Sequence, residues 1–167
     1  TTTDIMKNFG AVIEQGEDYL KITGNQGNVT IENNYIQCNE SGTTIRFIIP
    51  IALSRNNGQL TIDGKGKLIE RPFDTYYKIF DRQGISYKTT NGKLPLYIEG
   101  SLKADTFEVE GNISSQFITG LLYTLPLLDG DSEIVIKGPL ESKGYVDLTL
   151  KILEMAGIEV KNNDYKS

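Results

Sequence analysis

Two serines and a glutamine, Ser114, Ser115 and Gln116, stand where a predicted strand meets a predicted helix. Residues 106–110 alternate polar and apolar side chains, which is typical of a strand with one buried face. The apolar residues of 118–128 cover nearly every direction of a helix, so we expect that helix to be buried all round. The first N–H groups of a helix lack internal partners and carry partial positive charge. Hydroxyls beside them favour an anion such as a phosphate, although Ser114 can equally be a simple helix cap.

A second candidate anion site lies 73 residues earlier, where Ser41-Gly42-Thr43 opens another almost wholly apolar segment. Gly42 has no side chain and therefore lets a ligand approach the backbone closely. Arg46 follows one helical turn later, and Arg71 stands in a Glu-Arg-Pro turn before a predicted helix. Their planar guanidinium groups suit the recognition of carboxylate or phosphate. The alternative is that each is an isolated surface arginine, which usually contributes little.

Both candidate sites belong to a repeated pattern. Amphipathic helices are predicted to end at Gly10, Gly84 and Gly157, which are 74 and 73 residues apart, and each glycine precedes a short predicted strand. A period of this length is too long for a solenoid and predicts a duplicated α+β unit. The expected divisions of a single domain are the tail of one unit, a second unit and a third unit, over residues 1–26, 27–88 and 94–160.

Each unit is expected to contain a buried helix, an amphipathic helix and several strands. The buried helices are predicted over 43–53 and 115–125. The last amphipathic helix follows Ser142, a further candidate anion donor, and its apolar stripe is predicted to consist of Tyr145, Leu148, Thr149 and Ile152. Strands are predicted at 11–13, 19–23, 29–32, 35–38, 60–63, 85–87, 96–99, 106–110, 133–136 and 158–160.

Composition narrows the possible functions. The 167 residues, 38% of them apolar, suffice for one domain with a substantial core. Acidic residues outnumber basic ones by 22 to 17, which argues against nucleic acid as the main partner. No apolar run is long enough to cross a membrane. Cys38 is the single cysteine and histidine is absent, which excludes Ser-His and Cys-His mechanisms within this chain and argues against a zinc site. A reducing cytoplasm is the expected compartment.

Four ordered motifs resemble 5-enolpyruvylshikimate-3-phosphate synthase, an enolpyruvyl transferase of the shikimate pathway. They are Ser-Gly-Thr-Thr-Ile-Arg (41–46), Glu-Arg-Pro (70–72), Gly-Asn-Ile-Ser-Ser-Gln-Phe (111–117) and Leu-Glu-Ser-Lys-Gly-Tyr-Val-Asp (140–147). The resemblance covers almost the whole chain. It implies a lobe of repeated βαβαββ units, with helices inside and sheets outside. Because Thr1 opens directly into a helical pattern, we expect the chain to be a piece of the first large lobe.

The resemblance also implies what the residues of the serine motifs bind. Ser114, Ser115 and Ser142 resemble the hydroxyls that hold the 3-phosphate of shikimate 3-phosphate. Tyr145 resembles the aromatic residue that borders the shikimate ring. Gln116 resembles the amide that reaches both substrates.

The residues around the other helix start are implied to bind phosphoenolpyruvate. Gly42 and Arg71 resemble the glycine and the arginine that contact it, at the place where glyphosate also binds. Thr43 and Arg46 are given supporting roles. The common family pattern has Asn-Ala before the Gly-Thr, whereas this chain has Glu40-Ser41, which adds a negative charge beside Gly42.

The implied reaction joins the 5-hydroxyl of shikimate 3-phosphate to the enolpyruvyl group of phosphoenolpyruvate and releases phosphate. It serves chorismate and aromatic amino acid biosynthesis, needs neither cofactor nor metal, and takes place in a cytoplasmic monomer. The family's acid–base residues come from its second lobe. We therefore expect this chain to bind substrate and to be inactive alone, because proton transfer needs positioned acids and bases.

Three other interpretations fit parts of the pattern. UDP-N-acetylglucosamine enolpyruvyl transferase has the same fold, but it lacks Ser-Ser-Gln-Phe and uses a loop cysteine, whereas Cys38 falls in a predicted strand. RNA 3′-terminal phosphate cyclase shares the repeat unit and usually carries a histidine nucleophile, which this chain lacks. A non-catalytic phosphate-binding module is the alternative from a different class.

Overall fold

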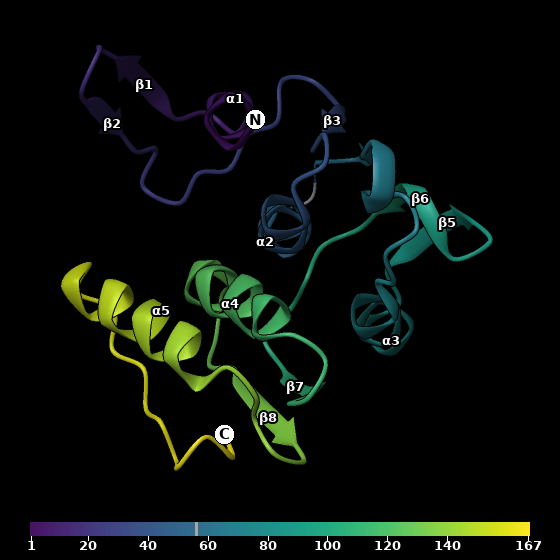
Figure 1. The fold of residues 1–167 in the computed structure, drawn as a ribbon, viewed down its shortest axis with the longest axis vertical. Helices are drawn as coiled ribbons and strands as arrows, with labels where there is room; N and C mark the ends of the chain where they lie inside the picture. Colours follow the sequence, from purple (N-terminus) through teal and green to yellow (C-terminus); the bar gives the residue numbers. More distant parts are fainter. Residues whose placement is uncertain (56) are drawn as a thin grey trace.

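The computed structural model describes residues 1–55 and 57–167, which form an α+β fold (Figure 1). Residue 56, within the range expected for the second repeat unit, lies outside the described residues. The helices of the described part are α1 (Thr2–Asn8), α2 (Gly42–Ala52), α3 (Asp74–Gln83), α4 (Ser115–Thr124) and α5 (Lys143–Met155), with short 3₁₀ turns η1 (Gly66–Leu68) and η2 (Leu125–Leu127). Its strands are β1 (Val12–Gln15), β2 (Leu20–Thr23), β3 (Tyr35–Gln37), β4 (Gln59–Asp63), β5 (Ser86–Thr90), β6 (Lys93–Glu99), β7 (Thr106–Glu110) and β8 (Glu133–Lys137).

The sheets follow the repeat. β3 and β4 pair in parallel, as do β7 and β8, and each pair is connected through a helix. β6 lies antiparallel between β4 and β5, and β1 and β2 form a separate antiparallel hairpin. Parallel neighbours need a long crossover, which α2 and α4 supply. The order β3-α2-β4-α3-β5-β6 is therefore a βαβαββ unit, and β7-α4-β8-α5 repeats its first four elements.

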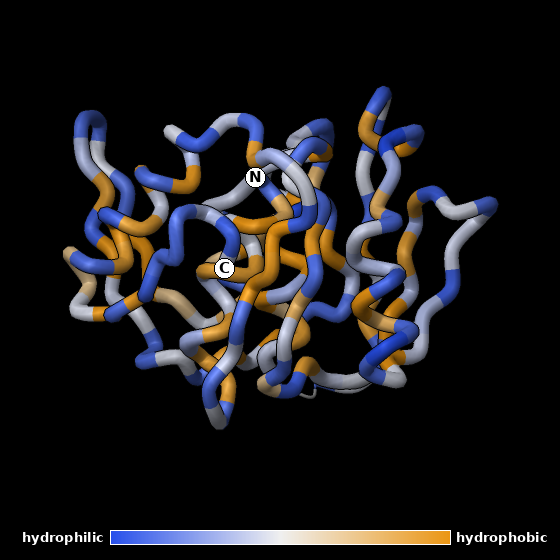
Figure 2. Tube along the Cα trace, turned by 90° about the horizontal axis from the view of Figure 1, so that it is seen from below, coloured by the Kyte–Doolittle hydropathy of each residue, from blue (hydrophilic) through white to orange (hydrophobic). Residues whose placement is uncertain are grey.

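The predicted buried helices are confirmed, since α2 and α4 lie in the middle of the molecule with the sheets around them (Figure 1). Ile45, Ile49 and Leu121 are fully buried there. Figure 2 shows the hydrophobic residues gathered in the interior, with hydrophilic residues at the loop tips. The predicted end of α3 is also confirmed, because Gly84 closes it in the left-handed conformation, with φ +68°, that glycine adopts readily.

One boundary of the expected units differs from the strand pairing. The third unit was expected to begin at residue 94, but residues 94–99 lie in β6, which pairs with β4 and β5. Leu94, Leu96 and Ile98 alternate along this strand and are buried in the core. Burial of this face joins β6 to the sheet of the second unit, and the next strand, β7, begins only at Thr106.

Two predicted strands do not form. Residues 29–32 and 158–160 have no strand conformation. Their backbone groups bond helix ends instead: the N–H of Glu32 donates to the carbonyl of Asn8 at 3.2 Å, and that of Ile158 to Leu153 at 2.9 Å. An extended segment is stabilised by pairing with a neighbour, and these donors are already occupied elsewhere.

The predicted stripe of α5 is wrong for three of its four residues. Tyr145, Leu148 and Ile152 are exposed, whereas Thr149 is buried. The buried face consists instead of Val146, Thr149 and Leu153. Both stripes have helical spacing, and contact with α4 selects between them, since the Thr149 hydroxyl lies 3.1 Å from that of Thr119.

The contact between α2 and α4 depends on Gly120. A Cβ at Gly120 would lie 2.6 Å from the Tyr76 hydroxyl and too close to the Arg46 carbonyl. The hydroxyl of Tyr76, in α3, donates to that same carbonyl. Pro50 explains why the carbonyl needs this donor, because proline has no N–H to bond the residue four positions earlier in the helix. Three helices therefore meet at one backbone oxygen.

Candidate functional site

The loops that precede α4 and α5 lie side by side. They follow β7 and β8, whose parallel pairing puts both carboxyl ends at one sheet edge. The Gly111 N–H donates to the carbonyl of Lys137 at 2.9 Å, and the Glu141 N–H donates to the carbonyl of Gly111 at 3.0 Å. A Cβ at Gly111 would lie 2.7 Å from the carbonyl oxygen of Pro139, so only glycine allows this approach. The serine loops of the sequence are thereby brought together.

The second unit has the same construction. β3 and β4 are parallel, and the loops that follow them bond to each other. The Cys38 N–H donates to the carbonyl of Asp63 at 2.8 Å, and the Lys65 N–H donates to the carbonyl of Asn39 at 2.6 Å. The segment leading to α3, with Arg71, thus leaves the same sheet edge as the start of α2.

Ser114 caps α4, as the simpler interpretation predicted. Its backbone is extended and its Oγ accepts from the N–H of Gln116 at 3.3 Å. Ser115 follows as the first helical residue and is 8% exposed. A capping hydroxyl still has a proton to donate, so the cap leaves Ser114 able to contact an anion.

Ser142 holds an unusual backbone conformation at the start of α5. Its φ and ψ are +59° and +40°, and its side chain makes no capping hydrogen bond. A non-glycine residue in this left-handed region costs about 1–3 kcal/mol and is found preferentially at functional sites. Tyr145 lies one turn further, 67% exposed, with its N–H donating to the Ser142 carbonyl at 3.1 Å.

Two guanidinium groups converge beside Gly42. A Cβ on Gly42 would lie 3.6 Å from Nη1 of Arg46 and 3.7 Å from Nη1 of Arg71. Gly42 is the first residue of α2, and Ser41 caps the helix by accepting from the N–H of Thr44 at 3.2 Å. Positive side chains and the N-terminal end of a helix dipole therefore occupy one place.

Gln116 connects the two helix starts. Its Oε1 accepts from Nη1 of Arg46 at 2.6 Å, and its Nε2 donates to the Thr43 hydroxyl at 2.7 Å. The structure thus brings together Thr43, Arg46 and Gln116, which the sequence had placed in two separate motifs. We call this set the amide bridge.

Arg46 is a buried cation without a carboxylate partner in the described part of the chain. Its guanidinium lies 5.0 Å from the ring centre of Phe117 and 5.9 Å from that of Phe73, and its Nε has no hydrogen-bond partner among the described residues. Burial, and then the charge of Arg71, lowers the pKa of Arg46. An incoming anion would offset this unfavourable positive charge.

Sequence reasoning missed the aromatic residues that support Arg46. Phe117 was named only as the end of a motif, and Phe73 and Tyr76 were not singled out, yet Tyr76 packs edge-on against Phe117 with ring centres 4.9 Å apart. The one available signal was Pro50, four residues after Arg46, which implies a carbonyl in need of an outside donor. That signal does not name the donor.

Other features of the described residues do not point to a different site. A cavity of about 230 Å³ between α3 and β7 is lined by none of the predicted site residues. Among residues 1–55 and 57–167 there is no cluster of side chains suited to a metal ion. The described helices include none long and apolar enough to span a membrane.

Comparison with known proteins gives concordant results. A family model of EPSP synthase (3-phosphoshikimate 1-carboxyvinyltransferase) matches residues 1–167. The 3-phosphoshikimate 1-carboxyvinyltransferase of Clostridium novyi is 56% identical over 88% of this chain, and that of Clostridium beijerinckii is 53% identical over 99%. The chain spans 33% and 39% of the length of these two relatives. An EPSP synthase structure from Acinetobacter baumannii has a TM-score of 0.78 at 20% identity, covering 98% of this chain and 37% of its own.

Proposed function

Because the chain belongs to the EPSP synthase family, we propose that it is the substrate-binding part of an enolpyruvyl transferase. The proposed whole reaction transfers the enolpyruvyl group of phosphoenolpyruvate to the 5-hydroxyl of shikimate 3-phosphate. The observation that carries this proposal is the pair of helix starts joined by the amide bridge. One is lined by hydroxyls and the other by guanidinium groups. Two adjacent anion sites of different character suit two different phosphorylated substrates.

The serine loops are the proposed site for shikimate 3-phosphate. Ser114, Ser115 and Ser142 stand at the starts of α4 and α5, on two loops that bond to each other. Their hydroxyls and the nearby backbone N–H groups can donate to phosphate oxygens. The exposed ring of Tyr145 would border the carbon ring of the substrate.

The start of α2 is the proposed site for phosphoenolpyruvate. Gly42 lets the ligand approach the backbone, and Arg46 and Arg71 supply the positive charge. Gln116 lies between this site and the serine loops, which suits a side chain that touches both substrates. Arg71 is exposed and can pair directly with the ligand, whereas Arg46 is buried and supports the site without direct contact.

The family match favours this function over that of a UDP-N-acetylglucosamine enolpyruvyl transferase. We propose further that the whole protein is a cytoplasmic monomer in aromatic amino acid biosynthesis and a target of glyphosate. Since this chain spans only 33–39% of two relatives, we expect no turnover from it alone. Phosphate release from the two substrates above a no-protein control would contradict that expectation.

Calorimetric titration of the chain with shikimate 3-phosphate tests the binding proposal. Hydrogen bonds to a charged group contribute about 1.5–3 kcal/mol each, and association entropy removes much of the sum. We therefore expect weak binding that Ser115→Ala and Ser142→Ala both reduce. Ser86→Ala, at an exposed position of strand β5, is the matched control and should bind as the parent does. Equal affinities for all four proteins, or no binding at millimolar concentration, would overturn the proposal.

A further inference from the structure

The hydrogen bonds of the amide bridge can run in only one direction. An arginine guanidinium carries donors and no acceptor, so the oxygen of the Gln116 amide must face Arg46. The amide nitrogen is then turned toward Thr43 and donates to its hydroxyl oxygen at 2.7 Å. A hydroxyl that accepts from one side keeps its own proton for another partner. Because Arg46 can only donate, the orientations of the Gln116 amide and of the Thr43 hydroxyl are both fixed.

We propose that Arg46 is a positioning residue that acts through Gln116 and makes the Thr43 hydroxyl a donor toward an anion at Gly42. This inference rests on the proposed phosphoenolpyruvate site. Thr43 is exposed at the start of α2, and Arg46 is 7% exposed behind it. The buried guanidinium of Arg46 therefore determines that the exposed Thr43 hydroxyl donates toward the ligand.

The surroundings of Arg46 keep this arrangement fixed. Its guanidinium lies against the rings of Phe117 and Phe73. Its backbone carbonyl is held by the hydroxyl of Tyr76. Phe117 follows Gln116 directly in α4. The same helical turn therefore supplies the ring that packs against the guanidinium and the amide oxygen that accepts its hydrogen bond. A group held on rigid elements in this way loses little entropy when the ligand binds.

The consequence is selectivity for ligands that accept hydrogen bonds. With the amide fixed, Thr43 and the second N–H of Gln116 can both donate outward, beside the guanidinium of Arg71. The bridge therefore turns two N–H or O–H donors toward the ligand. This surface favours an anionic oxygen over a neutral hydroxyl group, because hydrogen bonds to a charged acceptor are stronger.

A ligand-free measurement tests the orientation of the amide. In the parent chain we expect the Gln116 side-chain amide hydrogen that is bonded to Thr43 to exchange slowly with solvent in ¹H–¹⁵N spectra. Arg46→Met, which removes the cation but keeps the volume, should release the amide and speed that exchange about tenfold. Replacing a buried, unpaired charge by an apolar side chain is compatible with folding. Unchanged amide signals and exchange in folded Arg46→Met would overturn the inference and leave the proposed function intact.

A binding cycle tests whether Arg46 acts through Gln116. With phosphoenolpyruvate as the probe and shikimate 3-phosphate present, we expect Arg46→Lys and Gln116→Met each to weaken binding about tenfold, as one lost hydrogen bond would. The double variant should lose no more than either single one. Additive losses would show direct contact by Arg46 and contradict the positioning role. Arg82→Met removes one positive charge at an exposed ion pair, and it should leave binding unchanged.

Variants of Thr43 test the end of the bridge. Thr43→Ser keeps a hydroxyl and should bind phosphoenolpyruvate more tightly than Thr43→Val does. Thr43→Val has the same shape without the donor, and its affinity should fall about tenfold. Equal binding by both variants would exclude Thr43 as the donor and contradict the inference. If the parent binds neither phosphoenolpyruvate nor shikimate 3-phosphate, the proposed function fails, and the amide exchange still decides the orientation.

Discussion

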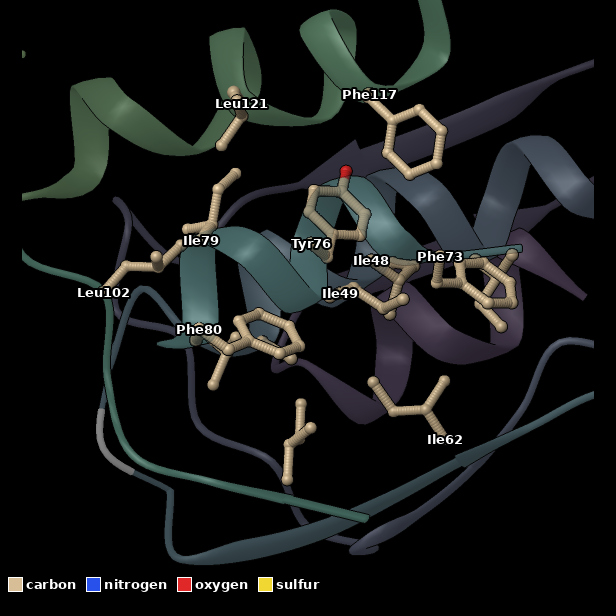
Figure 3. Packing of buried hydrophobic residues seen from close by; sticks show 14 of the residues in the cluster. Ile48, Ile49, Ile62, Phe73, Tyr76, Ile79, Phe80, Leu102, Phe117 and Leu121 are labelled. Carbon is tan, nitrogen blue, oxygen red and sulfur yellow. The ribbon is translucent and has the colours of Figure 1, made fainter. Parts of the chain in front are cut away.

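Replacing Tyr76 by phenylalanine should destabilise the protein through a single backbone oxygen. Tyr76 is 1% exposed, and its hydroxyl donates to the carbonyl of Arg46. Figure 3 shows this hydroxyl directed toward α4, between residues of the core. The carbonyl has no helical donor because Pro50 stands four residues later. Tyr76→Phe removes the hydroxyl and keeps the ring, so the decrease in unfolding free energy measures the cost of leaving the carbonyl oxygen unpaired.

The expected loss is the cost of leaving a buried acceptor unsatisfied, about 1–3 kcal/mol of unfolding free energy. For a chain of this size 1 kcal/mol corresponds to roughly 2–4 °C in Tm, so the melting temperature should fall by several degrees. Burial raises the pKa of Tyr76 above its ordinary value. The hydroxyl therefore remains a donor in neutral and mildly alkaline buffer, and the effect should not depend on pH there.

Chemical denaturation of a double-mutant cycle with Pro50→Ala isolates the proposed cause. Alanine at this position restores an N–H that can bond the Arg46 carbonyl within α2. In that background we expect Tyr76→Phe to cost less than about 0.5 kcal/mol, because the oxygen keeps a partner. An equal cost in both backgrounds would refute the reasoning, since the hydroxyl would then matter for another reason. So would a stability unchanged by Tyr76→Phe in the parent.

Three further changes test the packing and the cap. Gly120→Ala should cost about 3 kcal/mol or more, because its Cβ would lie 2.6 Å from the Tyr76 hydroxyl, and calorimetric melting measures the loss. Ser114→Ala should cost about 1 kcal/mol in urea unfolding by removing the cap of α4, whereas Ser115→Ala should cost less. Burial raises the pKa of Cys38 to about 12, so the folded state favours the thiol. The resulting stability is complete below the unfolded pKa near 9 and declines as pH rises from there toward 12. Cys38→Ala should flatten that decline, and a native thiol alkylated rapidly at pH 8 would contradict it.

Much of the fold could be predicted because the strands and buried helices have clear local periodicity. Residues 106–110 form β7 as their alternation predicted, and the apolar segments 43–53 and 115–125 form α2 and α4 within one residue at each end. The 73-residue offset found equivalent helix starts without any knowledge of the sheets. Which segments pair as strands was less predictable, because residues 29–32 have the composition of a strand but bond a helix end.

The residues of the candidate site could be named from the sequence, but their contacts could not. Arg46 and Gln116 are 70 positions apart, and their bond depends on how α2 packs against α4. The face of α5 was misassigned for the same reason, because Tyr145 and Val146 both begin stripes with helical spacing. Only tertiary packing decides which stripe is buried.

The absence of a side chain at Gly120 also bears on how the protein opens. α2 and α4 come from different repeat units, yet at this residue their backbones touch, and Tyr76 of α3 bonds into the same place. A repeat protein whose units contact only through side chains can unfold one unit at a time. Loss of α4 would uncover the Arg46 carbonyl of α2, and loss of α2 would uncover the backbone of α4 at Gly120. Amide hydrogens of α2 and α4 should therefore exchange with solvent together, as one cooperative body spanning both repeats.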